Sequence, residues 1–168
     1  MSLKIPVLRL LMTNALLGEL TDVLNGLYTP NRVWQGSLQT QIFEHPLLVQ
    51  FNSTNETGLT PELEQSLKTF LEQQKEYKQL ALSALLEYYQ TQIFPLWHEN
   101  NYFGVPELAP DIQNLAEFEA LLTYPRLWLH NANSWGLEFE CTWDVEHGTG
   151  VLFVDGQIVN VGLAEAAH

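Results

Sequence analysis

The chain has 168 residues, which is enough for one domain of moderate size, and we expect a single domain over residues 1–168. Its 20 acidic residues outnumber the 7 Lys and Arg residues, and a net charge of −13 argues against nucleic-acid or anionic-membrane binding because such a surface repels phosphates. The hydrophobic fraction of 46% excludes global disorder, and no apolar run reaches the roughly 18 residues of a membrane span.

The charge is distributed unevenly along the chain. Up to Lys78 there are 8 acids and 6 bases, a balance of −2, whereas the rest has 12 acids and the single base Arg126, a balance of −11. A strongly acidic half attracts a basic protein partner and speeds association with it. The alternative is that the acidity only maintains solubility.

The compartment is indicated by the cysteine content and by the N-terminus. Cys141 is the one cysteine, so no intrachain disulfide can form, which fits a reducing compartment. Arg9 interrupts the apolar N-terminal stretch, and no small-residue cleavage site follows, so no signal peptide is predicted. We therefore expect a cytoplasmic protein.

The N-terminal region predicts a β-hairpin. Residues 34–42 and 46–51 are rich in β-forming residues, and Glu44–His45–Pro46 between them predicts the turn. Residues 7–20 have an apolar spacing that fits either a helix or two short strands around Thr13–Asn14.

The middle region predicts two helices, over residues 61–74 and 77–93. Thr60 and Pro61 are typical of a helix N-terminus, and apolar residues follow at helical spacing. Pro95 is expected to end the second helix, because proline lacks the backbone donor that a helix interior needs. A further short helix is predicted over residues 114–122.

The C-terminal region predicts antiparallel strands. Residues 127–130 and 137–144 alternate between apolar and polar, 150–154 and 157–161 are β-forming, and Asp155–Gly156 is a strong hairpin signal. The fold class is therefore α+β, with an N-terminal β-hairpin, a central helical pair and a C-terminal antiparallel β-meander in one domain. On the strand over 137–144, the alternation predicts an outward face that carries three carboxylates, Glu138, Glu140 and Asp144.

The densest group of chemically capable residues is Asp144, Glu146 and His147, which we place in the turn between strands 137–144 and 150–154. A carboxylate beside an imidazole could act as a general base, so an acid–base or metal-dependent hydrolase is one hypothesis. The spacing matches no established metal-ligand pattern, and we predict neither a metal nor a cofactor. The purely structural alternative is a folding turn in which Gly148 and Gly150 adopt positive φ angles.

Two further observations argue against catalysis. Alternation places Cys141 on the face of Phe139 and Trp143, so its thiol is expected to be buried and unreactive. The sequence also contains no nucleophile elbow, no phosphate-binding glycine loop and no dinucleotide fingerprint. We therefore favour a protein-binding module whose binding residues are carboxylates and one histidine of the C-terminal strands: Glu138, Glu140, Asp144, Glu146 and His147.

A wider resemblance rests on the pattern from Cys141 to Val151, which reads C-x-W-D-x-E-H-G-x-G-V. Together with a Trp-x-Gly hairpin at Trp34–Gly36 and the pair Tyr88–Tyr89, it resembles an uncharacterised, mainly bacterial family of domains of unknown function. The resemblance implies no established activity. Related small acidic domains are often discussed as immunity or accessory proteins in bacterial toxin systems, so an immunity protein against a basic toxin, for example a nuclease, is one concrete form of the binding module.

Overall fold

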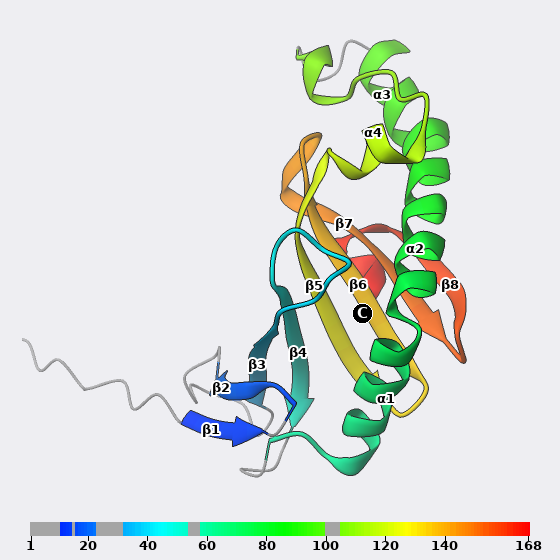
Figure 1. Cartoon of the computed structure of the whole chain (residues 1–168). Helices are drawn as coiled ribbons and strands as arrows, with labels where there is room; N and C mark the ends of the chain where they lie inside the picture. The colour runs from blue at the N-terminus through cyan, green and yellow to red at the C-terminus, as the bar shows by residue number, and fades with distance from the viewer. Residues whose placement is uncertain (1–10, 15, 23–31, 54–57, 100–104) are drawn as a thin grey trace, which may run out of the picture.

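The computed structural model in Figure 1 describes residues 11–14, 16–22, 32–53, 58–99 and 105–168. Its strands form one eight-stranded sheet in which spatial order follows chain order. All neighbouring strands are antiparallel except β4 and β5, which are parallel. The strands are β1 (Leu11–Asn14), β2 (Gly18–Asp22), β3 (Arg32–Leu38), β4 (Leu47–Ser53), β5 (Leu122–Asn131), β6 (Ser134–Cys141), β7 (Asp144–Val154) and β8 (Gln157–Leu163). The predicted α+β class and the C-terminal antiparallel meander are confirmed.

The helices lie together in the crossover between β4 and β5, because parallel neighbours cannot be joined by a tight turn. Two of them, α1 and α2, run along one face of the sheet (Figure 1). The segments are α1 (Pro61–Glu72), α2 (Gln74–Tyr88), the π-helical η1 (Tyr89–Ile93), α3 (Phe94–Glu99), the 3₁₀ turn η2 (Pro106–Leu108) and α4 (Leu115–Glu119). Among the described residues, none of the helices combines the length and apolar character that a membrane crossing requires.

The core lies between this helical layer and the sheet. It is rich in aromatic rings, and Tyr77 of α2 meets Trp135 and Phe153 of the sheet edge-on, with ring centroids 5.0 and 5.4 Å apart. Such edge-to-face pairs stabilise beyond the area they bury. The side chains that are almost wholly buried include Trp34, Phe51, Phe70, Tyr89, Phe118, Trp135 and Phe153.

The predicted helical pair is confirmed, but its C-terminal limit is wrong. Thr60 caps α1 as expected, because its hydroxyl accepts a hydrogen bond from the backbone N–H of Leu63 at 3.4 Å. Pro95 does not end the helical segment, which continues as α3 to Glu99. The preceding turn is π-helical, with the N–H of Phe94 donating to the carbonyl of Tyr89, and this wider turn accommodates the proline ring and its missing donor.

The N-terminal region contains strands throughout its described part. Of the two alternatives for residues 7–20, the described residues 11–14 and 18–20 take the strand form, and β2 begins at Gly18, whose φ is +65°. Residues 7–10 and 15 lie outside the described residues. The hairpin of β3 and β4 is confirmed, but its connection is residues 39–46 rather than a turn at Glu44–His45–Pro46. Tertiary contacts hold this longer loop, since the Phe43 ring lies 6.1 Å from the Phe139 ring.

The last strands differ from prediction in their boundaries. The turn after β6 is Thr142–Trp143, so Asp144, Glu146 and His147 lie within β7 rather than in the turn between two strands. Trp143 fixes this turn, because its side chain is buried in the core and the centre of its ring lies 4.8 Å from the centre of the Tyr89 ring. The turn at Asp155–Gly156 is confirmed, with φ angles of 50° and 74° that suit a tight hairpin.

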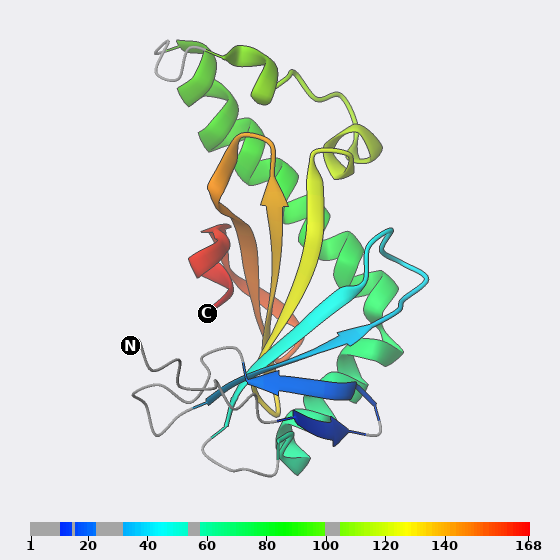
Figure 2. The same ribbon diagram turned by 90° about the vertical axis from the view of Figure 1, so that its left-hand side faces the viewer.

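The 3₁₀ turn η3 (Ala164–Ala167) folds back over the sheet face that the helices leave open (Figure 2). Ala167 is fully buried there. A Cβ on Gly136 would overlap the carbonyl group of Ala167, so only glycine permits this close approach. The open face of the sheet is therefore covered at its C-terminal strands.

A candidate binding hollow between two β-bulges

The candidate site begins with a bulge in β7. Phe139 is paired with Thr149, and Cys141 is paired with Asp144, so residues 145–148 stand opposite Glu140 alone. Extra residues in one strand bend it and push side chains out of the pleat. The bulge therefore carries Val145 and Glu146 outward, and both are exposed, Val145 to 79%.

The side chain of Asp144 closes this bulge. Its Oδ1 accepts a hydrogen bond from the backbone N–H of His147 at 3.0 Å and lies 3.0 Å from Nδ1 of the same residue. The hydrogen bond between the imidazole and Asp144, together with the charge of Asp144, raises the pKa of His147, and the nearby carboxylates of Glu146 and Glu165 act in the same direction. The imidazole therefore lies in a negative environment.

The two glycines of the bulge region serve different purposes. Gly148 adopts the expected positive φ, +67°, and a Cβ there would lie 2.5 Å from the carbonyl oxygen of Phe139. Gly150 does not have a positive φ, so that expectation is wrong. Position 150 favours glycine for another reason, because a Cβ there would lie 3.0 Å from the carbonyl oxygen of Ala164 in η3.

A second irregularity lies in β5. The pairing of β5 with β6 shifts between Thr123 and Arg126, and Tyr124 within this shift has a φ of +48°. A bulky residue rarely adopts this conformation, and it persists only when its surroundings enforce it. The Tyr124 ring is 53% exposed and stacks on His45 with a centroid distance of 4.9 Å.

A hollow of about 170 Å³ lies between the two bulges. Tyr124 and Arg126 line it from β5, and Glu146 and His147 line it from β7. Glu138 and Glu140 of the intervening strand β6 also line it, together with Ala164 of η3. The structure therefore brings four of the five predicted binding residues to one hollow, while Asp144 supports the bulge beside it.

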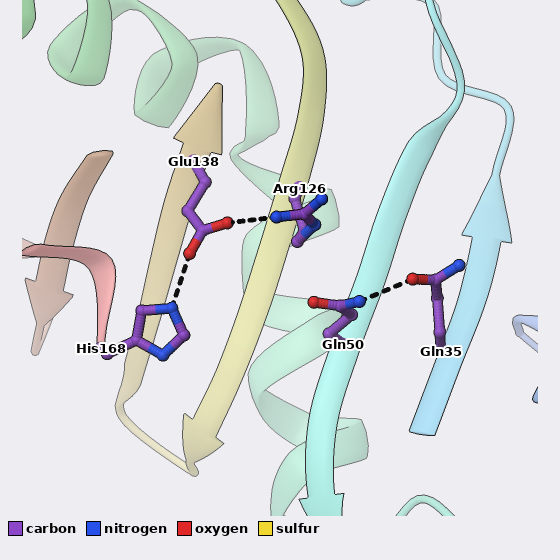
Figure 3. Close-up of polar contacts among 5 residues, drawn as sticks. All are labelled: Gln35, Gln50, Arg126, Glu138 and His168. Carbon is purple, nitrogen blue, oxygen red and sulfur yellow. Dashed lines mark hydrogen bonds and ion pairs between the residues drawn. The ribbon is translucent and has the colours of Figure 1, made fainter. Parts of the chain in front are cut away.

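Glu138 was expected to face solvent, and this is wrong. It is only 4% exposed, with Arg126 Nη1 2.7 Å from one carboxylate oxygen and His168 Nε2 2.6 Å from the other (Figure 3). The alternation correctly places Glu138 on the face opposite the helices, but η3 and His168 cover that face. Buried carboxylates are stable only when paired, so Glu138 is committed to these two partners.

Polar pairs continue along the same face. Gln50 Nε2 donates to Gln35 Oε1 at 2.6 Å, on strands β4 and β3 (Figure 3). On β5, His130 Nε2 donates to the carbonyl oxygen of Ala167 at 2.7 Å, which fastens η3 to the sheet. These contacts pair the side chains of Gln35, Gln50 and His130 within the chain.

Cys141 is buried at the end of β6. The thiol is buried and donates to the backbone oxygen of Asp144 at 3.5 Å, and burial raises its pKa to about 12. The prediction of a buried cysteine is confirmed. Within the described ranges, no three His, Cys, Asp or Glu side chains are arranged to hold a metal ion.

Sequence reasoning missed Tyr124 and Val145. Neither position carries a sequence signal, because a positive φ at tyrosine and a long bulge result from pairing with β6. Arg126 did carry a signal, since it is the only base after Lys78. In an acidic segment, a lone arginine is a natural partner for the one carboxylate that becomes buried.

The fold and the hollow define a class of protein: a small α+β domain with one helix-covered sheet and an acidic, bulged rim at its C-terminal strands. The chain belongs to the DUF6985 family, a domain of unknown function, which matches residues 23–168. This agrees with the resemblance to a family of unknown function. No curated protein and no solved structure matched the chain.

Proposed function

We propose that this chain is a cytoplasmic protein-binding module that holds a basic protein partner at the rim of the hollow between the two bulges. The contact residues are Tyr124, Glu140, Val145 and Glu146. An immunity protein that neutralises a basic toxin, for example a nuclease, is the concrete form of the proposal. A surface of this sign disfavours direct contact with nucleic acid.

The observation that carries the proposal is the pairing of exposed apolar and acidic groups at one place. Tyr124 is 53% exposed and Val145 is 79% exposed, and both line a hollow that Glu140 and Glu146 also line. Tyrosine is enriched at protein interfaces, where its ring supplies contact area and its hydroxyl remains hydrated. Carboxylates beside it favour a lysine- or arginine-bearing partner.

A structural argument supports assigning these residues to binding. Folding accounts for most of the segment 141–151: Asp144 closes the bulge, Gly148 and Gly150 fit close contacts, and Thr149 Oγ1 donates to the carbonyl of Gly162 at 2.7 Å. Val145 and Glu146 have no comparable role, because both side chains are exposed. Residues that folding does not require are the natural candidates for recognition.

The test is retrieval of partners from the native host by the tagged chain at low and high salt. The double variant Glu140→Lys, Glu146→Lys should lose the partner. The control is the double variant Glu87→Lys, Glu107→Lys, which makes the same change in net charge at exposed positions of α2 and η2. This control should still retrieve the partner. No partner, binding indifferent to salt, or equal loss in both variants would count against the proposal.

A second candidate function rests on the Asp144–His147 pair, whose 3.0 Å contact at the edge of the hollow suits a general base in a hydrolase. Since the Cys141 thiol is buried with a raised pKa, this base would have to activate water. Elemental analysis of untagged protein and a hydrolase screen of wild type and His147→Ala test it. Activity that His147→Ala abolishes would support the enzyme, and a metal-free, inactive protein would exclude it.

A further inference from the structure

The hollow between the two bulges has room for one inserted side chain rather than for a separate small molecule. Its volume is about 170 Å³, whereas pockets that hold small molecules usually measure roughly 300–1000 Å³. Its walls come from three adjacent strands, with Tyr124 on β5, Glu140 on β6 and Glu146 on β7. A partner's side chain that enters the hollow therefore meets all three strands at once.

The lining of the hollow carries an excess of negative charge. Three glutamates line it, and its one arginine, Arg126, is bound to Glu138 at 2.7 Å. Glu140 and Glu146 are both exposed, and neither forms an ion pair with a residue that the structure describes. With His147 uncharged, the lining has a net charge of −2. The hollow therefore attracts a cation.

The Tyr124 ring supplies an aromatic surface beside these carboxylates. His45 stacks on one face of the ring, with a centroid distance of 4.9 Å and 21° between the ring planes. Tyr124 is nevertheless 53% exposed, so its accessible surface is the opposite face and the edge of the ring. A cation over the face of an aromatic ring is attracted by the ring's negative face. The hollow therefore combines hydrogen-bond acceptors with a surface on which a cation can stack.

We propose that the hollow takes one arginine side chain of the basic partner, whose guanidinium group stacks on Tyr124 and donates hydrogen bonds to Glu140 and Glu146. Arginine suits these groups better than lysine does, because the planar guanidinium stacks on a ring and directs several N–H donors to carboxylates. The ammonium group of lysine acts only as a point charge. The arginine assignment rests on the proposed function, since it names the residue through which that basic partner binds.

The test is an NMR titration of the isotope-labelled chain with three short Gly-Ser peptides that differ only in their central residue, which is arginine, lysine or citrulline. The arginine peptide should shift the backbone resonances of Tyr124, Glu140 and Glu146. It should bind about two- to fivefold more tightly than the lysine peptide, which is the gain expected from stacking a cation at an exposed site. The citrulline peptide has the shape of arginine without the charge and should bind more weakly than the arginine peptide.

Variants separate the contribution of the ring from that of the carboxylates. Tyr124→Ala should remove the preference for arginine over lysine, whereas Tyr124→Phe should keep it because the ring remains. The double variant Glu140→Gln, Glu146→Gln should weaken both cationic peptides by about twofold or more. The matched control Glu87→Gln, Glu107→Gln removes two exposed carboxylates of α2 and η2 and should leave binding unchanged. Thermal unfolding of each variant should match wild type, which shows that the fold is retained.

The outcomes distinguish the arginine site from the proposed function. Equal binding of the arginine and lysine peptides, or a Tyr124→Ala variant that still prefers arginine, would overturn the arginine assignment and leave a basic partner in place. A hollow that responds to neither cationic peptide would also overturn it. Arginine-selective binding at the hollow, without any partner retrieved from the host, would support the arginine site and count against the proposed function alone.

Discussion

Asp144 Oδ1 lies 3.0 Å from both the backbone nitrogen and the ring Nδ1 of His147, so one carboxylate holds the backbone and the side chain of the same residue. The backbone contact spans the bulge of residues 145–148, and the ring contact orients the imidazole. This relationship explains why an aspartate and a histidine occur three residues apart in a strand. It also makes the bulge sensitive to pH.

The pKa of His147 should fall when Asp144 is replaced by asparagine, because the hydrogen bond and the charge that raise it are weakened. An NMR titration of His147 measures this directly. In the wild type the folded state binds this proton more tightly than the unfolded chain does. The resulting stabilisation is complete below about pH 6.5 and is lost as the pH rises through the raised pKa. An unchanged pKa in Asp144→Asn would contradict this account.

Gly148→Ala should destabilise the fold by more than about 1 kcal/mol, because a Cβ there meets both an unfavourable φ and the carbonyl oxygen of Phe139. Gly18→Ala separates these two effects. Gly18 has nearly the same φ, +65°, but no atom of the described residues lies within 4 Å of the point that its Cβ would occupy. Urea unfolding should show a larger loss of unfolding free energy for Gly148→Ala than for Gly18→Ala. Equal losses would show that the backbone near Phe139 shifts to make room for the added Cβ.

Arg126→Met should destabilise the fold by about 2 kcal/mol, because it leaves Glu138 buried with one partner fewer. Lys68→Met is the control, since its pair with Glu64 has the same 2.7 Å separation on an exposed helix face and should contribute under about 0.5 kcal/mol. The double variant Arg126→Met, Glu138→Leu should recover part of the loss. Denaturant unfolding measures all three, and a loss no larger than that of the control would refute the pairing.

Glu146→Ala should change the free energy of unfolding by less than about 0.5 kcal/mol, because the side chain is exposed at the tip of the bulge. Partner retention in the retrieval experiment should nevertheless fall. Nearly unchanged stability together with weaker partner retention distinguishes a residue used for recognition from a residue that the fold requires. A destabilisation as large as that of Gly148→Ala would place Glu146 among the residues that the fold requires.

Cys141 should resist thiol reagents in the folded protein at pH 8, since burial raises its pKa to about 12 and keeps it protonated. Absorbance after addition of a disulfide reagent measures the reaction. Modification should become complete only in denaturant. Rapid reaction of the native protein would show that the C-terminal strands open readily.

Much of the fold could be predicted from local pattern. The helix start at Thr60 and the tight turn at Asp155–Gly156 follow from short-range chemistry, and the burial of Cys141 follows from periodicity. The expectation that Pro95 ends the helix was wrong, because a π-helical turn accommodates the proline. In the candidate site, the outward position of Glu140 was predicted, whereas the burial of Glu138 was not.

The sequence by itself determined the α+β class, the acidic C-terminal half and the residue types gathered at 141–151. Only the tertiary structure decided the parallel pairing of β4 with β5, the two bulges and the hollow between them. It also decided that Glu138 is buried, because His168 and η3 return over the sheet face. The physical reason is range: alternation and turn chemistry act between near neighbours, whereas strand register and the covering of a face depend on segments that meet only in the folded chain.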